Sequence, residues 1–262
     1  MDPNSNLSQT VNRVPLIIFL YWVIKIASTT LGETGADIFS MTLNIGYATT
    51  ILIFLSIFLV LLVLKLWLRR YDPILYWLLF TTSAISGTAI SDFIDRTIGL
   101  GYTLGLFSLL LLLILVLVVW KKVEKTISVE NILTSKAEIF YWVAFLVANT
   151  LGTAAGDFLA DELGIGFMKS AMIISTILFG IVLLHYYTRI SKVALFWFAF
   201  VLTRPFGATF GDLLTKTRDL GGLNIGIIWS SIFFSVVLVI SVFQENKLEK
   251  VRNENPAMES EM

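Results

Sequence analysis

The chain has 262 residues, of which 56% are hydrophobic and 15% are charged, and its mean hydropathy is +0.83. An ordinary soluble domain carries about a quarter charged residues, so this composition excludes that class and indicates a membrane protein. The formal net charge of zero gives no indication of a nucleic-acid partner, and the absence of cysteine excludes disulfides, thiolate metal sites and cysteine catalysis.

Eight apolar runs, each about long enough to cross a bilayer, predict eight transmembrane helices. They are expected at about residues 15–37, 46–67, 73–92, 101–120, 138–160, 166–187, 192–214 and 223–243. Residues 1–13 are polar and predicted to be disordered, residues 121–136 form a charged cytoplasmic linker, and residues 244–262 form a charged cytoplasmic tail. The first run contains Lys25 and has no small-residue cleavage site, so we interpret it as a retained helix that starts near Pro15.

One pattern, Trp-x9-Gly-x4-Asp-x8-Gly, occurs four times in the chain. The four aspartates lie 55, 65 and 55 residues apart, so the first and third copies, like the second and fourth, are 120 residues apart. A fixed period of this kind is the signature of a repeat architecture. The sequence therefore predicts an all-α, polytopic membrane helix bundle built from four two-helix repeats in a nested duplication, with halves at residues 14–120 and 137–243.

The distribution of lysine and arginine predicts the orientation of the repeats. Most of these residues lie at the termini and in the loops between repeats, which places both termini in the cytoplasm. All four hairpins then point the same way, in the parallel rather than the inverted kind of duplication. The four repeated aspartates are accordingly expected to meet at the outer face.

The odd-numbered spans contain Thr, Ser, Asn, Gly and charged residues, whereas the even-numbered spans are nearly pure Leu, Ile, Val and Phe. Polar side chains in a bilayer must face protein or water, so we expect four inner odd helices wrapped by four even ones. Small residues one turn from each aspartate would let the inner helices approach closely. The glycines predicted to pack in this way are Gly32, Gly87, Gly152 and Gly207. The repeated tryptophans are expected to act as interfacial anchors or in packing.

The acidic residues of the inner helices predict a cation site at the outer mouth. The candidate metal ligands are Asp37, Asp92, Asp157, Asp212 and Glu33. Carboxylates with Thr and Asn oxygens suit hard divalent ions such as Mn²⁺, Mg²⁺ or Ca²⁺, and we expect no other cofactor. The alternative is that the aspartates only cap or hydrogen-bond the hairpins.

Three further polar residues lie deeper in the spans and are candidates for a gate or for charge pairing: Lys25, Arg204 and Asn149. A charge within a span costs about 2.5–3.5 kcal/mol on insertion scales unless a partner or water reduces that cost. We therefore predict a salt bridge between Glu33 and Arg204, with Lys25 hydrogen-bonded nearby. The alternative is that these contacts only lock the bundle.

Two stretches of the sequence resemble a family of bacterial multi-pass proteins labelled uncharacterised membrane-anchored proteins. They are Thr29-Thr30-Leu31-Gly32-Glu33-Thr34 with Asp37, and Arg204-Pro205-Phe206-Gly207-Ala208-Thr209-Phe210-Gly211-Asp212. Gly221-Gly222-Leu223 is also similar to that family, and the resemblance extends over about residues 15–243. It implies a location in the bacterial inner membrane and carries over no activity.

Three function classes remain after these observations. The first is a transporter or exporter of a small inorganic cation, in particular a divalent metal ion. The second is a membrane scaffold or sensor whose polar residues only hold helices together. An intramembrane enzyme is disfavoured because no nucleophile and base constellation is visible. The Gly-Asp pairs are also unlike those of aspartyl proteases, because Ala155 and Phe210 precede them and no partner Tyr-Asp pair occurs. The sequence does not indicate the oligomeric state.

Overall fold

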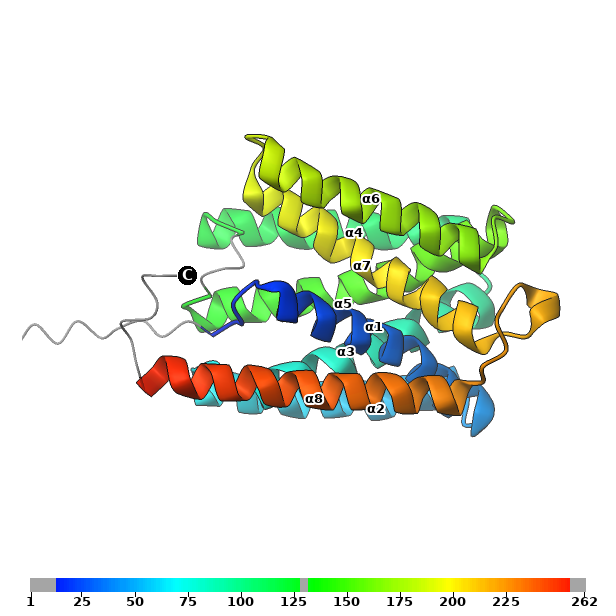
Figure 1. The fold of residues 1–262 in the computed structure, drawn as a ribbon, viewed down its shortest axis with the longest axis horizontal. Helices are drawn as coiled ribbons and strands as arrows, with labels where there is room; N and C mark the ends of the chain where they lie inside the picture. The colour runs from blue at the N-terminus through cyan, green and yellow to red at the C-terminus, as the bar shows by residue number, and fades with distance from the viewer. Residues whose placement is uncertain (1–12, 128–131, 255–262) are drawn as a thin grey trace, which may run out of the picture.

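The computed structural model describes residues 13–127 and 132–254, and within these residues the fold consists of α-helices and short helical turns, with no strands. Eight α-helices run roughly along one direction (Figure 1). They are α1 (Phe19–Asp37), α2 (Tyr47–Leu68), α3 (Pro73–Asp92), α4 (Tyr102–Glu124), α5 (Ser135–Asp157), α6 (Phe167–Tyr187), α7 (Lys192–Thr215) and α8 (Ile227–Glu254). The all-helical class is confirmed.

Several helix boundaries differ from the sequence-based prediction. The fourth helix ends at Glu124 and not near residue 120, and the fifth begins at Ser135 and not near residue 138, so both ends of the predicted linker are helical. The first helix begins at Phe19 and not near Pro15, because Ile18 has an extended backbone. The last helix begins at Ile227, just after Gly226 with its φ of +96°, and it continues through the charged segment to Glu254. Residues 1–12 of the predicted disordered segment 1–13, part of the predicted linker and residues 255–262 lie outside the described residues. Arg13, the last residue of that segment, is described and is buried in an ion pair with Glu138, so the prediction is wrong for this residue.

Seven helices are long and apolar enough to cross a membrane, judged by length and composition within the described residues. These candidate spans are Tyr47–Leu68, Pro73–Thr97, Tyr102–Glu124, Ser135–Glu162, Phe167–Tyr187, Lys192–Thr215 and Ile227–Arg252. The first helix is not among them, because it carries Lys25, Glu33 and a run of Ser, Thr and Gly. These polar residues are buried within the bundle.

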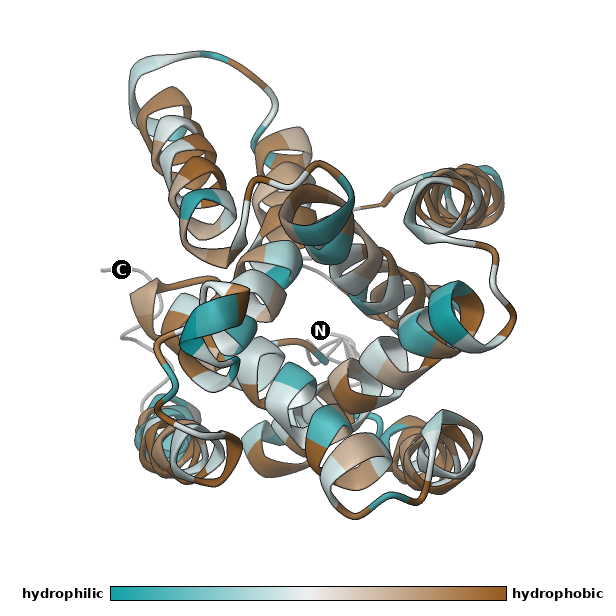
Figure 2. Ribbon diagram, turned by 90° about the vertical axis from the view of Figure 1, so that its right-hand side faces the viewer, coloured by the Kyte–Doolittle hydropathy of each residue, from teal (hydrophilic) through white to brown (hydrophobic). Residues whose placement is uncertain are grey.

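The four odd-numbered helices form the inner ring that the polar pattern predicts. Neighbouring members pack in the cyclic order α1, α3, α5, α7 and back to α1. Seen from the end where the hairpins turn, the four even-numbered helices lie around this ring (Figure 2). The even helices are mostly exposed along their length, whereas the odd ones are mostly buried.

Each even helix packs mainly against the odd helix of the following repeat and not against its own partner in the hairpin. Thus α2 packs on α3, α4 on α5, α6 on α7, and α8 closes the ring by packing on α1. No single hairpin can therefore bury its inner helix alone, as is typical of repeat architectures.

The connection between the two helices of a repeat is a wider, π-helical turn in the first three repeats. These turns are Ile38–Thr42, Phe93–Thr97 and Phe158–Glu162, and each directly follows a repeated aspartate. The even helix then starts after Gly46, Gly101 or Gly166, whose φ angles of +76° to +81° favour glycine. The fourth repeat differs, because α7 continues to Thr215 and a short 3-10 turn, Arg218–Leu220, precedes Gly221.

Candidate functional site

The four repeated aspartates lie at the same end of the inner helices, and all four are buried. Asp37, Asp92 and Asp157 are the last residues of α1, α3 and α5, and Asp212 lies in the last turn of α7. The aspartates therefore occupy equivalent positions at the ends of the four inner helices, although the connection that follows differs in the fourth repeat. Electrostatic interactions link Asp212 with Asp37 and Asp157, and Asp92 with Asp37.

Two basic residues join these aspartates in pairs. Lys216 Nζ lies 3.2 Å from Asp212 Oδ1 and 3.3 Å from Asp37 Oδ2. Arg96 Nε lies 3.4 Å from Asp92 Oδ1, and Arg96 Nη2 lies 3.5 Å from Asp157 Oδ2. Each base therefore bridges the aspartate of its own repeat to that of the next repeat in the ring.

The two bases are counterparts in the larger duplication. Arg96 and Lys216 each follow their own aspartate by four residues and are 120 residues apart. The same position holds Met41 in the first repeat and Asp161 in the third. Burial alone would lower the pKa of Lys216, but the carboxylates of Asp212 and Asp37 outweigh it and raise the pKa above the usual range of lysine. Lys216 is therefore charged at neutral pH.

The candidate metal ligands do not form one shared cage. The structure places Asp37 with Asp212, Asp92 with Asp157, and Glu33 one turn deeper. Across the described residues, no group of three or more His, Asp or Glu side chains is arranged to hold a metal ion. The sequence pattern identifies the four equivalent aspartates, but it does not show that a base lies between the members of each pair.

Arg204 occupies the level below the aspartates and contacts the other three repeats. Its Nη1 and Nη2 donate to Glu33 Oε2 at 3.2 Å, its Nη2 donates to Thr153 Oγ1 at 2.8 Å, and it also contacts Thr88 Oγ1. Thr88 donates to the same Glu33 oxygen at 3.2 Å. The predicted salt bridge between α1 and α7 is present, at 3.2 Å, and both partners are buried.

Lys25 and Asn149 bind neighbouring helices, and neither has a carboxylate partner within the part of the chain that the structure describes. Lys25 Nζ donates to Phe200 O and Thr203 Oγ1 of α7, both at 2.6 Å. It also lies 3.2 Å from the centroid of the Phe200 ring. Asn149 Nδ2 donates to Ser83 Oγ of α3 at 2.9 Å. Lys25 is thus hydrogen-bonded near Arg204, as predicted, whereas Asn149 joins α5 to α3.

Aromatic side chains pack together at the level of Lys25. Phe80, Phe145 and Phe200 stand twelve residues before the aspartates of their repeats, the position that Lys25 holds in the first repeat. The ring centroids of Phe145 and Phe200 are 4.0 Å apart, and Phe80 lies 5.7 Å from Phe145. Sequence reasoning missed this aromatic layer, although the repeated Phe at a fixed distance from each Asp is a signal that could have found it.

The four glycines predicted to pack lie at equivalent contacts around the ring. A Cβ added to Gly32 would lie 2.6 Å from Ala84 Cβ, and one added to Gly87 would lie 2.9 Å from Asn149 Cβ. Gly152 packs in the same way against Arg204, and Gly207 against Thr29. Each glycine therefore contacts the next repeat, eight residues before the aspartate of that repeat. Glycine at these positions lets four helix backbones approach closely enough for the polar side chains to meet.

The opposite end of the bundle holds a second buried ionic cluster that sequence reasoning missed. Arg13 Nη1 lies 2.9 Å from Glu138 Oε2, and Lys65 Nζ lies 3.5 Å from Glu138 Oε1. Tyr71 OH donates to Glu245 Oε1 at 2.6 Å, and Trp77 Nε1 also donates to Glu245. Trp77, Trp142 and Trp197 are buried, so these repeated tryptophans pack within the bundle.

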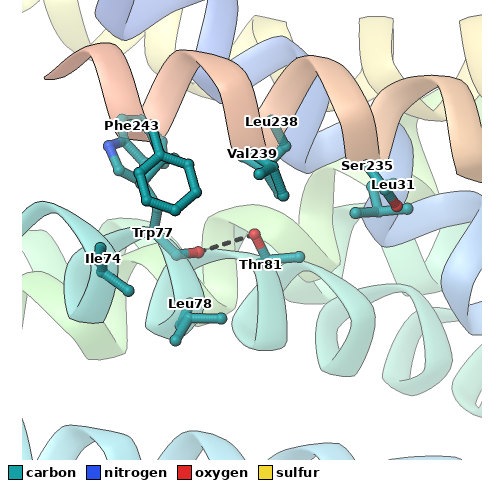
Figure 3. A pocket seen from close by; sticks show the side chains of 10 residues that line it. Leu31, Ile74, Trp77, Leu78, Thr81, Ser235, Leu238, Val239 and Phe243 are labelled. Carbon is teal, nitrogen blue, oxygen red and sulfur yellow. Dashed lines mark hydrogen bonds between the residues drawn. The ribbon is translucent and has the colours of Figure 1, made fainter. Parts of the chain in front are cut away.

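An apolar groove of about 330 Å³ lies on the outside of the ring, between α3 and α8 (Figure 3). Trp77, Leu78, Leu238 and Val239 are among its lining residues, and Thr81 Oγ1 is bonded to the carbonyl of Trp77. No acidic side chain lines this groove.

Comparison with known proteins confirms the internal repeat. The sequence profile of a family described as Repeat of Unknown Function (DUF347) matches residues 20–71, 75–126, 140–191 and 195–244. No curated protein and no solved structure matches the chain significantly. Each matched segment starts two residues before a repeated tryptophan, so the profile and the Trp-Gly-Asp pattern define the same four units. Since these units make up more than half of the sequence, the chain belongs to the DUF347 repeat family.

Proposed function

We propose that the protein is a multi-pass protein of the bacterial inner membrane, that all eight helices cross the bilayer, and that both termini are cytoplasmic. Seven helices have the length and composition of membrane spans. The remaining helix, α1, is enclosed by its neighbours, so its charged side chains are shielded from lipid. The concentration of lysine and arginine at the end opposite the aspartates supports this orientation.

The function proposed for this fold is transport of a cation along the centre of the ring. The observation that carries this proposal is the buried set of carboxylates at one end of the inner helices. Among the described residues, the bases paired with Glu33 and the four aspartates are Arg96, Arg204 and Lys216. Five acids against three bases leave an excess of negative charge, which raises the local concentration of cations. Carboxylate and hydroxyl oxygens suit a hard divalent ion such as Mn²⁺, Mg²⁺ or Ca²⁺.

The path beyond the aspartates is closed at two levels, and we assign gating to them. The Glu33–Arg204 pair, held by Thr88 and Thr153, blocks the centre directly below the aspartates. The aromatic layer with Lys25 closes the next level. Passage of an ion requires both levels to open in turn, so we assign Lys25 and Arg204 to gate opening and not to ion binding. Asn149, which joins α5 to α3, stands at the position equivalent to Arg204 in its repeat and is assigned the same role.

The competing proposal is a membrane scaffold or sensor without transport. It is favoured by the hydrogen bonds of Arg204 to side chains of the three other repeats, which is the pattern expected of a lock between helices. The two proposals differ in whether the aspartates are needed for movement of an ion.

Reconstitution into liposomes tests the transport proposal. We expect the intact protein to move Mn²⁺, Mg²⁺ or Ca²⁺ down an imposed gradient, and we expect the double variant Asp157→Asn with Asp212→Asn to reduce that flux to the level of protein-free vesicles. The reason is that each substitution removes one carboxylate charge from one of the two pairs. The matched control is Asp219→Asn, which makes the same chemical change at an exposed residue. Equal fluxes for the intact protein and the double variant would favour the scaffold.

A further inference from the structure

The position of Lys216 differs from that of an ordinary structural lysine. It directly follows the end of α7 at Thr215, its backbone is extended, and its side chain is 23% exposed. Its ammonium nevertheless lies between two carboxylates that are each less than a tenth exposed. Arg96, with a side chain that is 32% exposed, has the same relation to Asp92 and Asp157. Both bases therefore approach the buried carboxylates from partly exposed positions.

The carboxylates between which these bases lie are incompletely satisfied. Asp92 Oδ1, Asp157 Oδ2 and Asp212 Oδ1 are buried and have no hydrogen-bond partner in the part of the chain that the structure describes. Their contacts with the bases, at 3.2–3.5 Å, are longer than charge-assisted hydrogen bonds, which are typically about 2.7–2.9 Å. A buried charged oxygen without a hydrogen bond is costly. A more closely coordinated cation would relieve that cost.

The fold of the hairpin does not need a base at this position. Met41 stands at the equivalent place in the first repeat and Asp161 in the third, yet both repeats form the same π-helical turn. The bases occur only in the second and fourth repeats, where each bridges to the following repeat. The result is two equivalent half-sites, each with two carboxylates and one tethered base.

We propose that Lys216 and Arg96 are built-in competitors of the transported cation, which binds a half-site by displacing the base from between its two carboxylates. This inference rests on the proposed cation transport. Two carboxylates and one base carry a net charge of −1, whereas two carboxylates and a divalent ion are neutral. An ion such as Mg²⁺ is commonly bound by one or two carboxylates together with several waters. The half-site supplies two carboxylates, and water can reach the ion once the base has moved toward solvent.

The test is the affinity of the purified, full-length protein for Mn²⁺, measured as free Mn²⁺ by electron paramagnetic resonance. Lys216→Met copies the residue of the first repeat and removes the competitor from the Asp37–Asp212 half-site. We expect Lys216→Met to bind Mn²⁺ at least about ten-fold more tightly than the wild type, because a like charge a few ångströms from the ion opposes its binding. Lys216→Arg keeps the charge and should remain close to the wild-type affinity.

A matched control separates this effect from a general change of surface charge. Lys169→Met makes the same substitution at an exposed residue near the start of α6, at the same end of the molecule, and should leave the affinity unchanged. If Lys216→Met fails to fold, Arg96→Met provides the same test at the second half-site. Unchanged or weaker Mn²⁺ binding by the folded variant, or no Mn²⁺ binding by either variant or wild type, would overturn the proposal.

The two proposals fail in different ways. Ion flux that depends on the aspartates, together with unchanged Mn²⁺ affinity in Lys216→Met, would leave transport standing and reject the tethered competitor. Tighter Mn²⁺ binding by Lys216→Met without flux in the wild type would establish the competitor and reject transport.

Discussion

Replacing Arg204 with methionine is expected to destabilise the folded protein by about 3–5 kcal/mol, the cost typical of removing one partner of a buried ion pair. Arg204 is 1% exposed, and its guanidinium donates to Glu33 and Thr153. Without it, the Glu33 carboxylate stays buried without its opposite charge, and contacts between α7 and three other inner helices are lost. Thermal unfolding of the purified protein in detergent, followed by circular dichroism, measures the effect.

Two further variants show whether this loss comes from the unpaired carboxylate. Arg218→Met makes the same change at an exposed residue and should unfold close to the wild-type temperature. The double variant Glu33→Gln with Arg204→Met should recover part of the stability, since it removes the uncompensated charge. Equal unfolding temperatures for Arg204→Met and Arg218→Met would show that the pair does not hold the ring together.

Replacing Gly152 with alanine is expected to cost about 1–3 kcal/mol, the usual penalty for adding a methyl group to a well-packed interior. The new Cβ would overlap Cβ and Cγ of Arg204 and lie 3.1 Å from Pro205 Cδ. The inner helices α5 and α7 must then move apart, and this movement pulls Arg204 away from Glu33. We therefore expect a lower unfolding temperature by the same measurement.

The chain supplies its own control for this substitution. Gly180 lies in α6, and apart from its own helix backbone no atom lies within 4 Å of a Cβ built on it. Alanine is favoured over glycine by roughly 0.8–1.0 kcal/mol in a helix interior, so Gly180→Ala should be neutral or stabilising. Similar effects of Gly152→Ala and Gly180→Ala would contradict the close approach of the inner helices at the repeated glycines.

Much of the fold could be predicted from the sequence because the pattern is repeated. Because Asp, Gly and Trp recur at fixed distances, the spacing of four residues along each odd helix identifies one polar face, and that face defines the inner ring. The Glu33–Arg204 pair could be predicted in the same way, because a buried charge is costly unless a residue of opposite charge lies beside it. The glycines were recognised as small residues on the neighbouring face.

Other features depend on which repeat packs against which, and the spacing does not contain that information. Lys216 contacts Asp37, which lies 179 residues earlier, because α7 and α1 close the ring. From the sequence alone, Lys216 and Arg96 are two of the few bases that lie outside the termini and the loops between repeats. The cluster of Glu138 with Arg13 and Lys65 likewise forms between segments that are distant in sequence. The π-helical turns also have no simple sequence signal, although the glycines that follow them do.

The central claim is that four hairpins stand in the same direction in the membrane and bring their acidic ends to one face. The natural absence of cysteine allows a direct measurement, because every introduced cysteine is the only thiol in the chain. Exposed positions at the acidic end are available in each repeat: Met41, Ile98, Leu163 and Leu220. Trp67 and Tyr187 are exposed at the opposite end.

Labelling with a membrane-impermeant maleimide in intact cells then shows on which side of the membrane each residue lies. The account predicts that single cysteines at Met41, Ile98, Leu163 and Leu220 are all labelled from outside, whereas those at Trp67 and Tyr187 react only after the membrane is permeabilised. Labelling of any two of the four acidic-end positions from opposite sides of the membrane would contradict it.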